Sequence, residues 1–366
     1  MLRLVVFFTL FSAGPILQAQ TPARAPSPTP AATPSATPAA TPATQALINS
    51  LGSEDLEQAI QLLKSNFINP DALNETELNR ALLSGVLARL GRGAMILPEQ
   101  ASRPSEMTSK FFGEVLDGHI GYLRLGALDA ANLQAMDAQL QTFVAKKVDA
   151  AVIDLRASGG TNDFALAAEF AKRFTTKGKL LFTLRKPTAN QERAFTADRD
   201  PAFQGLMIVL ADGETSGPAE AIAGALRLHS KALIIGQPTA GEAVEYSDLP
   251  LNGGTILRVG VAETVLPEGR ALFPGGLQPD VPVEMPVAEK RVVFQQSLEK
   301  GMSQFIYENE RPHLNEAALL AGKNPEIEAM ETAQRRMRGN EKPTTRDPVL
   351  QRAVDVVTSL AIYQHR

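Results

Sequence analysis

Apolar side chains recur at helical spacing near both ends of the chain. The clearest stripes are Leu56, Ile60, Leu63 and Phe67; Leu78, Leu82, Val86 and Leu90; and Leu350, Val354, Val357 and Ala361. A helix-start signal precedes each of them: Ser53 as a candidate cap, the Asn74–Glu77 capping-box pattern, and Asp347 followed by Pro348. We therefore predict three helices, and we expect the first two to bury their stripes in a core.

Between these stripes the pattern changes to short apolar runs that alternate with helical segments. Residues 111–125 predict a β-hairpin, because Asp117-Gly118 is a pair that favours a tight turn. Further buried strands are predicted at 151–155, 180–184, 206–210 and 232–235, and helices at 132–147, 164–174 and 219–229. Strands that alternate with helices are typical of parallel βα units, so we predict an α/β fold here. Beyond residue 283 the pattern is helical.

The first 45 residues do not resemble a folded domain. A positive start at Met1–Arg3 is followed by an apolar run and by Leu17-Gln18-Ala19, which resembles a signal-peptidase site. Residues 20–45 are mostly Thr, Pro, Ala and Ser, which predicts a disordered linker. A signal peptide and a linker indicate export to the periplasm or cell surface of a bacterium. An uncleaved membrane anchor is the alternative.

Composition excludes several kinds of site. The 366 residues carry 36 Lys+Arg and 40 Asp+Glu, a net charge of −4, which argues against a nucleic-acid partner. The chain has 0 Cys, which excludes disulfides, thiol nucleophiles and cysteine zinc sites. No two of its 4 His share a metal-ligand spacing, so we predict neither a metal nor another cofactor.

Four segments resemble the core of the C-terminal processing, or tail-specific, serine peptidases. They are IGYLRL at 120–125, IDLRASGGT at 153–161, GQPTAG at 236–241 and PEGRALFPGGLQPDVPV at 267–283. The resemblance implies a crotonase-like, Clp-protease-like α/β spiral and a peptide or unfolded protein segment as ligand. The family usually carries a PDZ module before the core, but the stretch between Leu97 and the hairpin is too short for one.

These patterns divide the chain into five predicted regions. They are a signal peptide at 1–19, a Pro/Ala/Thr-rich linker at 20–45, an N-terminal helical region at 46–100, a tail-specific-protease-like core at 106–286 and a C-terminal helical region at 287–366.

The resemblance also assigns the family's active-site positions. The family has a Ser nucleophile three residues before a helix-opening Glu and a Lys base twenty-five residues after the nucleophile. With Glu220 as that Glu, the nucleophile position is Gly217, the base position is Glu242, and the residue that orients the base is Tyr246. Pro218, after the nucleophile, has no N–H for an oxyanion. We therefore expect a peptide- or ligand-binding pseudoenzyme.

Two alternatives remain open. If the alignment slips by one residue, Ser216 becomes the nucleophile of an active peptidase, with Glu242 as a carboxylate base; otherwise Ser216 caps the helix that Pro218 opens. The third hypothesis is a scaffold or assembly protein with an envelope or membrane-associated partner. Gly159 and Gly160 are candidate oxyanion or peptide-binding donors, or plain turn glycines. The sequence leaves the ligand and the oligomeric state open.

Overall fold

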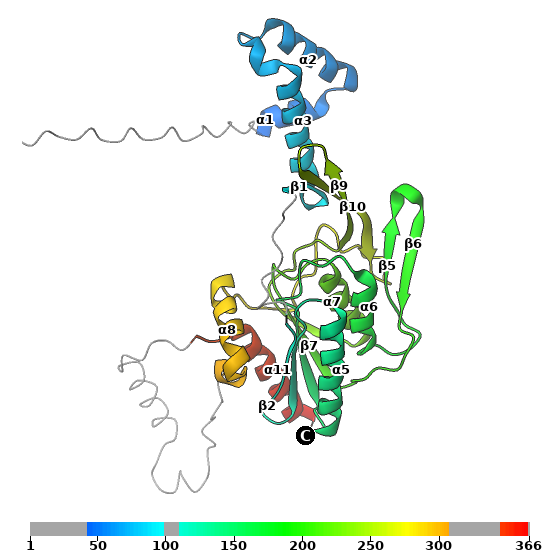
Figure 1. Ribbon diagram of the computed structural model, residues 1–366, viewed down its shortest axis with the longest axis vertical. Helices are drawn as coiled ribbons and strands as arrows, with labels where there is room; N and C mark the ends of the chain where they lie inside the picture. The colour runs from blue at the N-terminus through cyan, green and yellow to red at the C-terminus, as the bar shows by residue number, and fades with distance from the viewer. Residues whose placement is uncertain (1–41, 99–109, 307–344, 365–366) are drawn as a thin grey trace, which may run out of the picture. The chain divides into compact units, whose positions relative to one another are not determined.

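The computed structural model describes residues 42–98, 110–306 and 345–364 (Figure 1). The predicted signal peptide and most of the predicted linker lie outside the described residues. The chain divides into two compact units, Met1–Leu78 and Asn79–Arg366. Among the described residues, no helix is both long enough and apolar enough to cross a membrane.

The helices come in chain order as follows: α1 (Pro42–Ser50), α2 (Ser53–Asn66), η1 (Pro70–Leu73), α3 (Glu75–Leu90), η2 (Gly91–Gly93), α5 (Ala130–Ala145), α6 (Phe164–Lys172), η3 (Pro187–Ala189), α7 (Pro218–His229), α8 (Val287–Lys300), η4 (Ser303–Phe305) and α11 (Pro348–Gln364). The strands are β1 (Ala94–Pro98), β2 (Phe112–Leu116), β3 (Ile120–Arg124), β4 (Ala150–Asp154), β5 (Leu180–Lys186), β6 (Gln191–Thr196), β7 (Leu206–Ala211), β8 (Leu233–Gly236), β9 (Val244–Leu251), β10 (Thr255–Val265) and β11 (Val281–Pro282).

The described part of the first unit consists of short helices with little buried surface. The Asn74 side chain caps α3 by accepting from the Glu77 N–H at 3.0 Å, as predicted, whereas Gly52 rather than Ser53 occupies the cap position of α2. Neither α2 nor α3 has a buried residue, so the prediction of two core helices is wrong. Within the described chain α2 packs mainly against η1, which leaves its apolar stripe uncovered. Residues 42–45, assigned to the linker, are helical in α1.

A mostly parallel sheet forms the centre of the second unit. Its order is β11-β8-β7-β4-β3-β2, and only β2 is antiparallel to its neighbour. The β2–β3 turn is the predicted one: Asp117 and Gly118 have φ of 48° and 75°, and the His119 N–H donates to the Leu116 carbonyl at 3.2 Å. Both positive φ values fit a type I′ turn, which suits Asp-Gly.

Alternate residues of this sheet face two separate apolar cores. Ile153 and Val209 pack with side chains of α5, α6 and α7, while Val152 and Ile208 pack with side chains of α8 and α11. The sheet is therefore the middle of three layers, as predicted for an α/β fold (Figure 1). The predicted C-terminal stripe is confirmed at Leu350, Val354 and Val357, which are buried.

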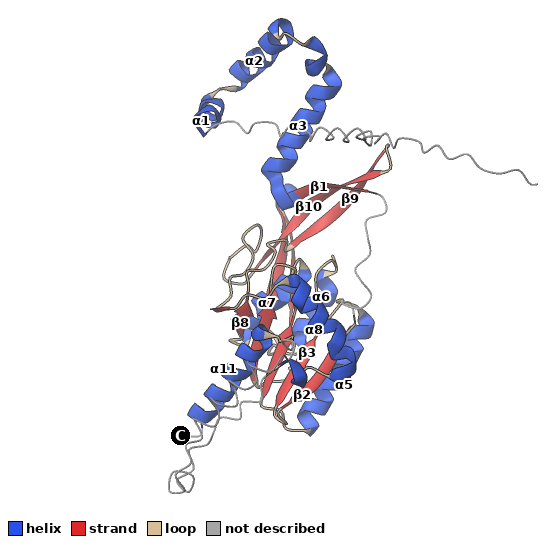
Figure 2. Cartoon of the chain, turned by 90° about the vertical axis from the view of Figure 1, so that its left-hand side faces the viewer, coloured by secondary structure: helices blue, strands red, loops and turns tan. Residues whose placement is uncertain are grey.

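A second, antiparallel sheet was only partly predicted. Its order is β1-β10-β5-β6, with β9 also paired to β10 (Figure 2). The predicted strand at 180–184 is present as β5, but it belongs to this sheet and not to the parallel one. Ala94–Pro98, assigned to the N-terminal helical region, is strand β1 and pairs with Thr255–Val259 of β10. β1 is therefore part of the second unit's sheet.

An ion network ties α11 to the sheet. The Arg156 guanidinium, 1% exposed, lies 2.6 Å from Asp154 and 2.7 Å from Asp347. Burial alone would raise the pKa of Asp154, but the charge and hydrogen bonds of Arg156 hold it below its ordinary value. Asp347 also accepts from the N–H groups of Val349 and Leu350 and so caps α11. The charge pair between Asp154 and Arg156 thus has a structural role.

Candidate functional site

Gly217 lies on the turn between β7 and α7, immediately before Pro218 opens the helix. Its φ of 59° and ψ of −127° are disfavoured for residues with a side chain, which explains the glycine. A Cβ at this position would lie 3.3 Å from the Thr161 carbonyl oxygen and 3.7 Å from that of Glu242. The turn therefore faces the loop around Thr161 and the start of the loop around Glu242.

The buried carboxylate of Glu220 holds two of these loops together. One oxygen accepts from the Thr239 hydroxyl and from the Gly241 N–H at 2.8 Å. The other accepts from the Gly217 N–H at 3.1 Å and the Glu242 N–H at 2.7 Å. Burial raises the pKa of Glu220, although these hydrogen bonds oppose that rise. Glu220 thus fixes the predicted nucleophile position against the predicted base position.

The GQPTAG segment packs directly on the closing segment that follows Pro267. Gly241 has φ 70°, and a Cβ there would lie 2.1 Å from the Pro274 carbonyl oxygen, so only glycine fits. The Thr239 N–H donates to the Leu277 carbonyl at 3.0 Å, and the Leu277 N–H donates to the Thr239 hydroxyl at 2.8 Å. Two segments that carried the family resemblance therefore meet at this site.

The side chain of Glu242 is paired with a cation that the sequence analysis missed. Arg92, in the short turn before β1, lies 3.2 Å from the Glu242 carboxylate and donates to the Ala240 carbonyl. The Tyr246 hydroxyl donates to the Arg92 carbonyl at 2.8 Å and so does not orient Glu242. Burial and the nearby charge of Glu242 raise the pKa of Tyr246 to about 12. The base position is an ion pair, in which the carboxylate's charge is already balanced.

Ser216 and the two glycines of the β4–α6 loop form the other side of the site. A Cβ on Gly159 would lie 2.8 Å from the Ser216 hydroxyl oxygen and 2.5 Å from the Glu214 carbonyl oxygen, so the two loops are in close contact. Within the described chain, the Ser216 hydroxyl makes no hydrogen bond with Glu242 or another base. The N–H groups of Gly159 and Gly160 likewise have no acceptor among the described residues.

A buried lysine supports the turn that carries Ser216. Lys290 of α8 is 2% exposed. Its ammonium donates to the Asp212 carboxylate, to Glu214 at 2.8 Å and to the Arg156 carbonyl at 2.9 Å. Burial alone would raise the pKa of Glu214, but the hydrogen bond and charge of Lys290 hold it below its ordinary value. The sequence offered no signal for this lysine, because its partners are far away along the chain.

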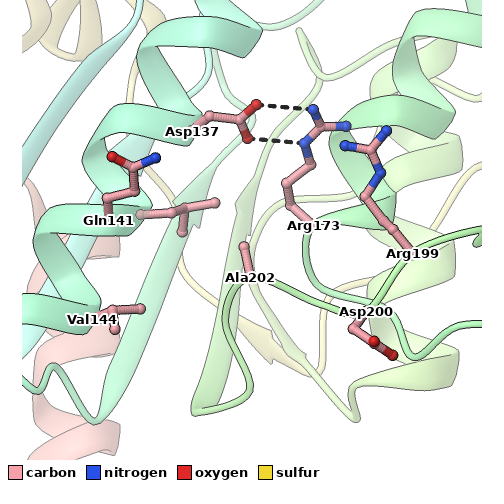
Figure 3. A pocket seen from close by; sticks show the side chains of 8 residues that line it. Asp137, Gln141, Val144, Arg173, Arg199, Asp200 and Ala202 are labelled. Carbon is pink, nitrogen blue, oxygen red and sulfur yellow. Dashed lines mark hydrogen bonds and ion pairs between the residues drawn. The ribbon is translucent and has the colours of Figure 1, made fainter.

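A separate pocket lies between α5 and the loop around residue 200. Figure 3 shows Asp137 and Arg173 facing each other across it, joined by two hydrogen bonds of 2.9 Å. Arg199 and Gln141 also line this pocket, but none of the predicted site residues does. No group of three or more His, Asp or Glu side chains among the described residues is arranged to hold a metal ion.

Comparison with known proteins gives matches over the same central region. Residues 119–283 match the family model "Peptidase family S41". A carboxy-terminal-processing protease of Bartonella bacilliformis is 31% identical over 180 residues, which are 48% of this chain and 41% of that protein. A carboxyl-terminal-processing protease of Synechocystis is 25% identical over 168 residues, 46% of this chain and 39% of that protein. This chain thus spans about two fifths of the length of these relatives.

Solved structures are similar over larger shares of the chain. A putative peptidase from Parabacteroides merdae has 16% identity and a TM-score of 0.49, covering 66% of this chain and 85% of that one. The photosystem II D1 C-terminal processing protease has 21% identity and a TM-score of 0.41, covering 52% and 47%. Residues 119–283 of this chain therefore match peptidase family S41, and this region is homologous to the C-terminal processing proteases.

Proposed function

We propose that this chain is an exported S41-family protein that binds peptides or unfolded protein segments without hydrolysing them. The observation that carries the proposal is the chemistry of the residues at the site. Gly217 offers no hydroxyl, Pro218 offers no N–H to an oxyanion, and Glu242 is an ion-paired carboxylate where a neutral amine would be needed. Each change removes a different requirement of serine catalysis.

The proposed ligand contact is the turn at Gly159 and Gly160. Their N–H groups have no acceptor within the described chain, and a peptide carbonyl satisfies two such donors well. The Glu220 carboxylate keeps the surrounding loops in place by accepting hydrogen bonds from their backbone N–H groups. The relatives are named as proteases, and proteases act on polypeptides, which supports the same ligand class for this chain.

The first prediction concerns hydrolysis. A serine-directed fluorophosphonate probe is expected to leave the purified mature chain unlabelled, because no described base contacts the Ser216 hydroxyl. Labelling is followed by mass spectrometry of the intact protein, with an active serine hydrolase as positive control. Labelling that disappears in Ser216→Ala would identify an active Ser216 peptidase and contradict the proposal.

Binding is tested separately, with fluorescein-labelled casein as the probe in an anisotropy titration. Gly159→Ala should abolish binding, because its Cβ would press on the Glu214 carbonyl at 2.5 Å and displace the loop. Gly213→Ala is the matched control on the neighbouring turn, where a Cβ meets no atom within 4 Å. Absence of binding by the unmodified chain, or equal binding by both variants, would reject the proposed ligand contact.

The second prediction concerns export. We expect cleavage after Ala19, because the apolar run that precedes it ends in a signal-peptidase-like sequence. Mass spectrometry of the N-terminus, on protein from the periplasm of an expressing bacterium, checks this expectation. Recovery of an intact Met1 in the membrane fraction would instead support an uncleaved anchor.

A further inference from the structure

A cluster of exposed lysines lies at the edge of the parallel sheet where its strands begin. α5 leads from β3 to β4 and α7 from β7 to β8, and the strands of each pair are parallel. Each helix must therefore run back along the sheet and end at the edge where the strands start. Lys146 and Lys147 follow α5, and Lys231 follows the end of α7. The ends of the two helices thus bring three lysines to this edge.

The loop between α6 and β5 adds two lysines at the same edge. It carries Lys177 and Lys179, and a His229 ring nitrogen at the end of α7 lies 2.6 Å from the Leu180 carbonyl oxygen. The five lysines are all exposed, and none of them forms an ion pair with another described residue. We call them the basic edge: Lys146, Lys147, Lys177, Lys179 and Lys231.

The loops that lead into β3, β4, β5, β7 and β8 are positively charged, although the chain as a whole is negative. These loops are residues 117–119, 146–149, 173–179, 197–205 and 230–232. They hold seven basic and four acidic residues, a net charge of +3 with histidine neutral, whereas the whole chain has a net charge of −4. The acidic residues are Asp117, Asp149, Asp198 and Asp200. A positive patch on a negative protein attracts anionic surfaces.

Two lysines of the basic edge occupy backbone conformations that favour glycine. Lys147 has φ 54° and Lys231 has φ 52°, each directly after the cap residue of its helix. Glycine is the usual residue at this position, because it adopts the left-handed region without a steric penalty. Lys146 and Arg227 already place a cation at the two helix ends, so the helix dipoles do not require a second one. Backbone strain of this kind often marks a functional residue.

An exposed apolar side chain precedes each of these two lysines by three residues. Val144 is 63% exposed and Leu228 is 36% exposed. Surfaces that bind anionic membranes combine basic side chains with apolar ones that enter the headgroup region. Nucleic-acid sites rely instead on arginine forks and stacked aromatic rings. The basic edge consists of lysines and the chain has 0 Trp, so lipid is the anionic partner that these residues fit.

We propose that the basic edge binds an anionic lipid surface, with Val144 and Leu228 at the level of the lipid headgroups. Gly159 and Gly217 follow β4 and β7, so they lie at the opposite edge of the sheet, where the strands end. Lipid binding would therefore hold the candidate site away from the bilayer. No residue of the basic edge belongs to that site, so lipid binding and peptide binding can each be present without the other.

Removing the two left-handed lysines tests the proposal without straining the fold. Lys147→Gly combined with Lys231→Gly should weaken binding to vesicles of phosphatidylcholine with about 30% phosphatidylglycerol by about 30-fold, because each basic residue near such a surface contributes roughly fivefold. Thermal unfolding should stay close to that of the unmodified chain, since glycine adopts a φ of this sign without strain. Co-sedimentation of the mature chain with the vesicles measures binding, and circular dichroism measures unfolding.

Lys110→Gly combined with Lys300→Gly is the matched control, because it removes the same charge from exposed positions outside the basic edge. This variant should bind the vesicles as the unmodified chain does. Equal weakening by the two double variants would overturn the proposal. So would an unmodified chain that does not bind the anionic vesicles, binds pure phosphatidylcholine equally well, or binds a DNA duplex more tightly.

Leu228→Trp gives an independent readout of which surface meets the lipid, because the chain has 0 Trp of its own. Its fluorescence emission should shift to shorter wavelength when the anionic vesicles are added. Leu249→Trp is the control, since Leu249 is 48% exposed on β9, in the other sheet, and its emission should not shift. Any result other than a shift confined to Leu228→Trp would overturn the proposal.

Discussion

Replacing Arg156 by methionine is expected to lower the free energy of unfolding by about 3–5 kcal/mol at neutral pH. The guanidinium lies between the carboxylates of Asp154 and Asp347, and all three side chains are buried. Methionine would leave two buried carboxylates without a cation. The loss should also weaken the attachment of α11, since Asp347 caps that helix. Urea denaturation followed by circular dichroism measures the change.

The size of this loss should depend on pH. In the unmodified chain the folded-state pKa of Asp154 is lowered, so its stabilising contribution is present above the unfolded pKa and lost as pH falls through the folded value. Without Arg156, burial is opposed mainly by the hydrogen bond from the Tyr122 hydroxyl, so that pKa should rise, and the carboxylate then destabilises the fold at neutral pH and takes up a proton in acid. The difference between the two proteins should therefore shrink as the pH approaches about 4.

Arg185→Met provides the control for this experiment. Arg185 also pairs with a carboxylate, at 2.6 Å from Glu263, but its side chain is 45% exposed. Exposed pairs contribute only about 0–1 kcal/mol, so this variant should stay close to the unmodified chain. Similar losses for Arg156→Met and Arg185→Met would show that the buried network does not hold α11 to the sheet.

Gly217→Ser combined with Glu242→Lys is expected not to restore hydrolysis of casein. The two changes return a hydroxyl and an amine, but Pro218 still withholds one N–H from the oxyanion, and such a donor is worth about 2.7–4 kcal/mol of transition-state stabilisation. The new lysine would also face Arg92, which now lies 3.2 Å from the Glu242 carboxylate. A serine at position 217 would have to adopt the strained φ of 59°.

Adding Pro218→Ala as a third change should be the step that first gives detectable turnover, if any combination does. The measurement is release of acid-soluble fragments from casein by the double and triple variants, with the unmodified chain as the blank. Robust cleavage by the double variant alone would place the oxyanion donors elsewhere. It would also contradict the alignment that assigned Gly217 to the nucleophile position and Glu242 to the base position.

Local signals explain which elements the sequence predicted correctly. The hairpin turn follows from Asp117-Gly118, whose conformations need no distant partner. The buried strands β4 and β7 were recognisable because both of their faces are covered by helices, which gives uninterrupted apolar runs. By contrast, β9 and β10 are mostly only partly buried, lack such a run, and were not predicted.

The sequence predicted which loops form the candidate site, but not all of the side-chain contacts within it. The resemblance located Gly217 and Glu242, and Glu220 indeed connects their backbone N–H groups. Arg92 could not be found, because nothing near it in the sequence marks its pairing with a carboxylate 150 positions away. The two helices that precede Arg92 were assigned to a core because the spacing of apolar residues predicts an apolar helix face. That spacing does not show what covers the face.

The attachment of α11 has a consequence for how this chain can be re-engineered. The Asp347 N–H donates to the Phe305 carbonyl at 3.0 Å, so these two positions, far apart in the sequence, lie side by side in the second unit. Two positions held this close can be joined by connections of different length, because the entropy of closing a flexible loop varies only with the logarithm of the loop's length. The same two neighbouring ends offer a position for inserting a reporter domain.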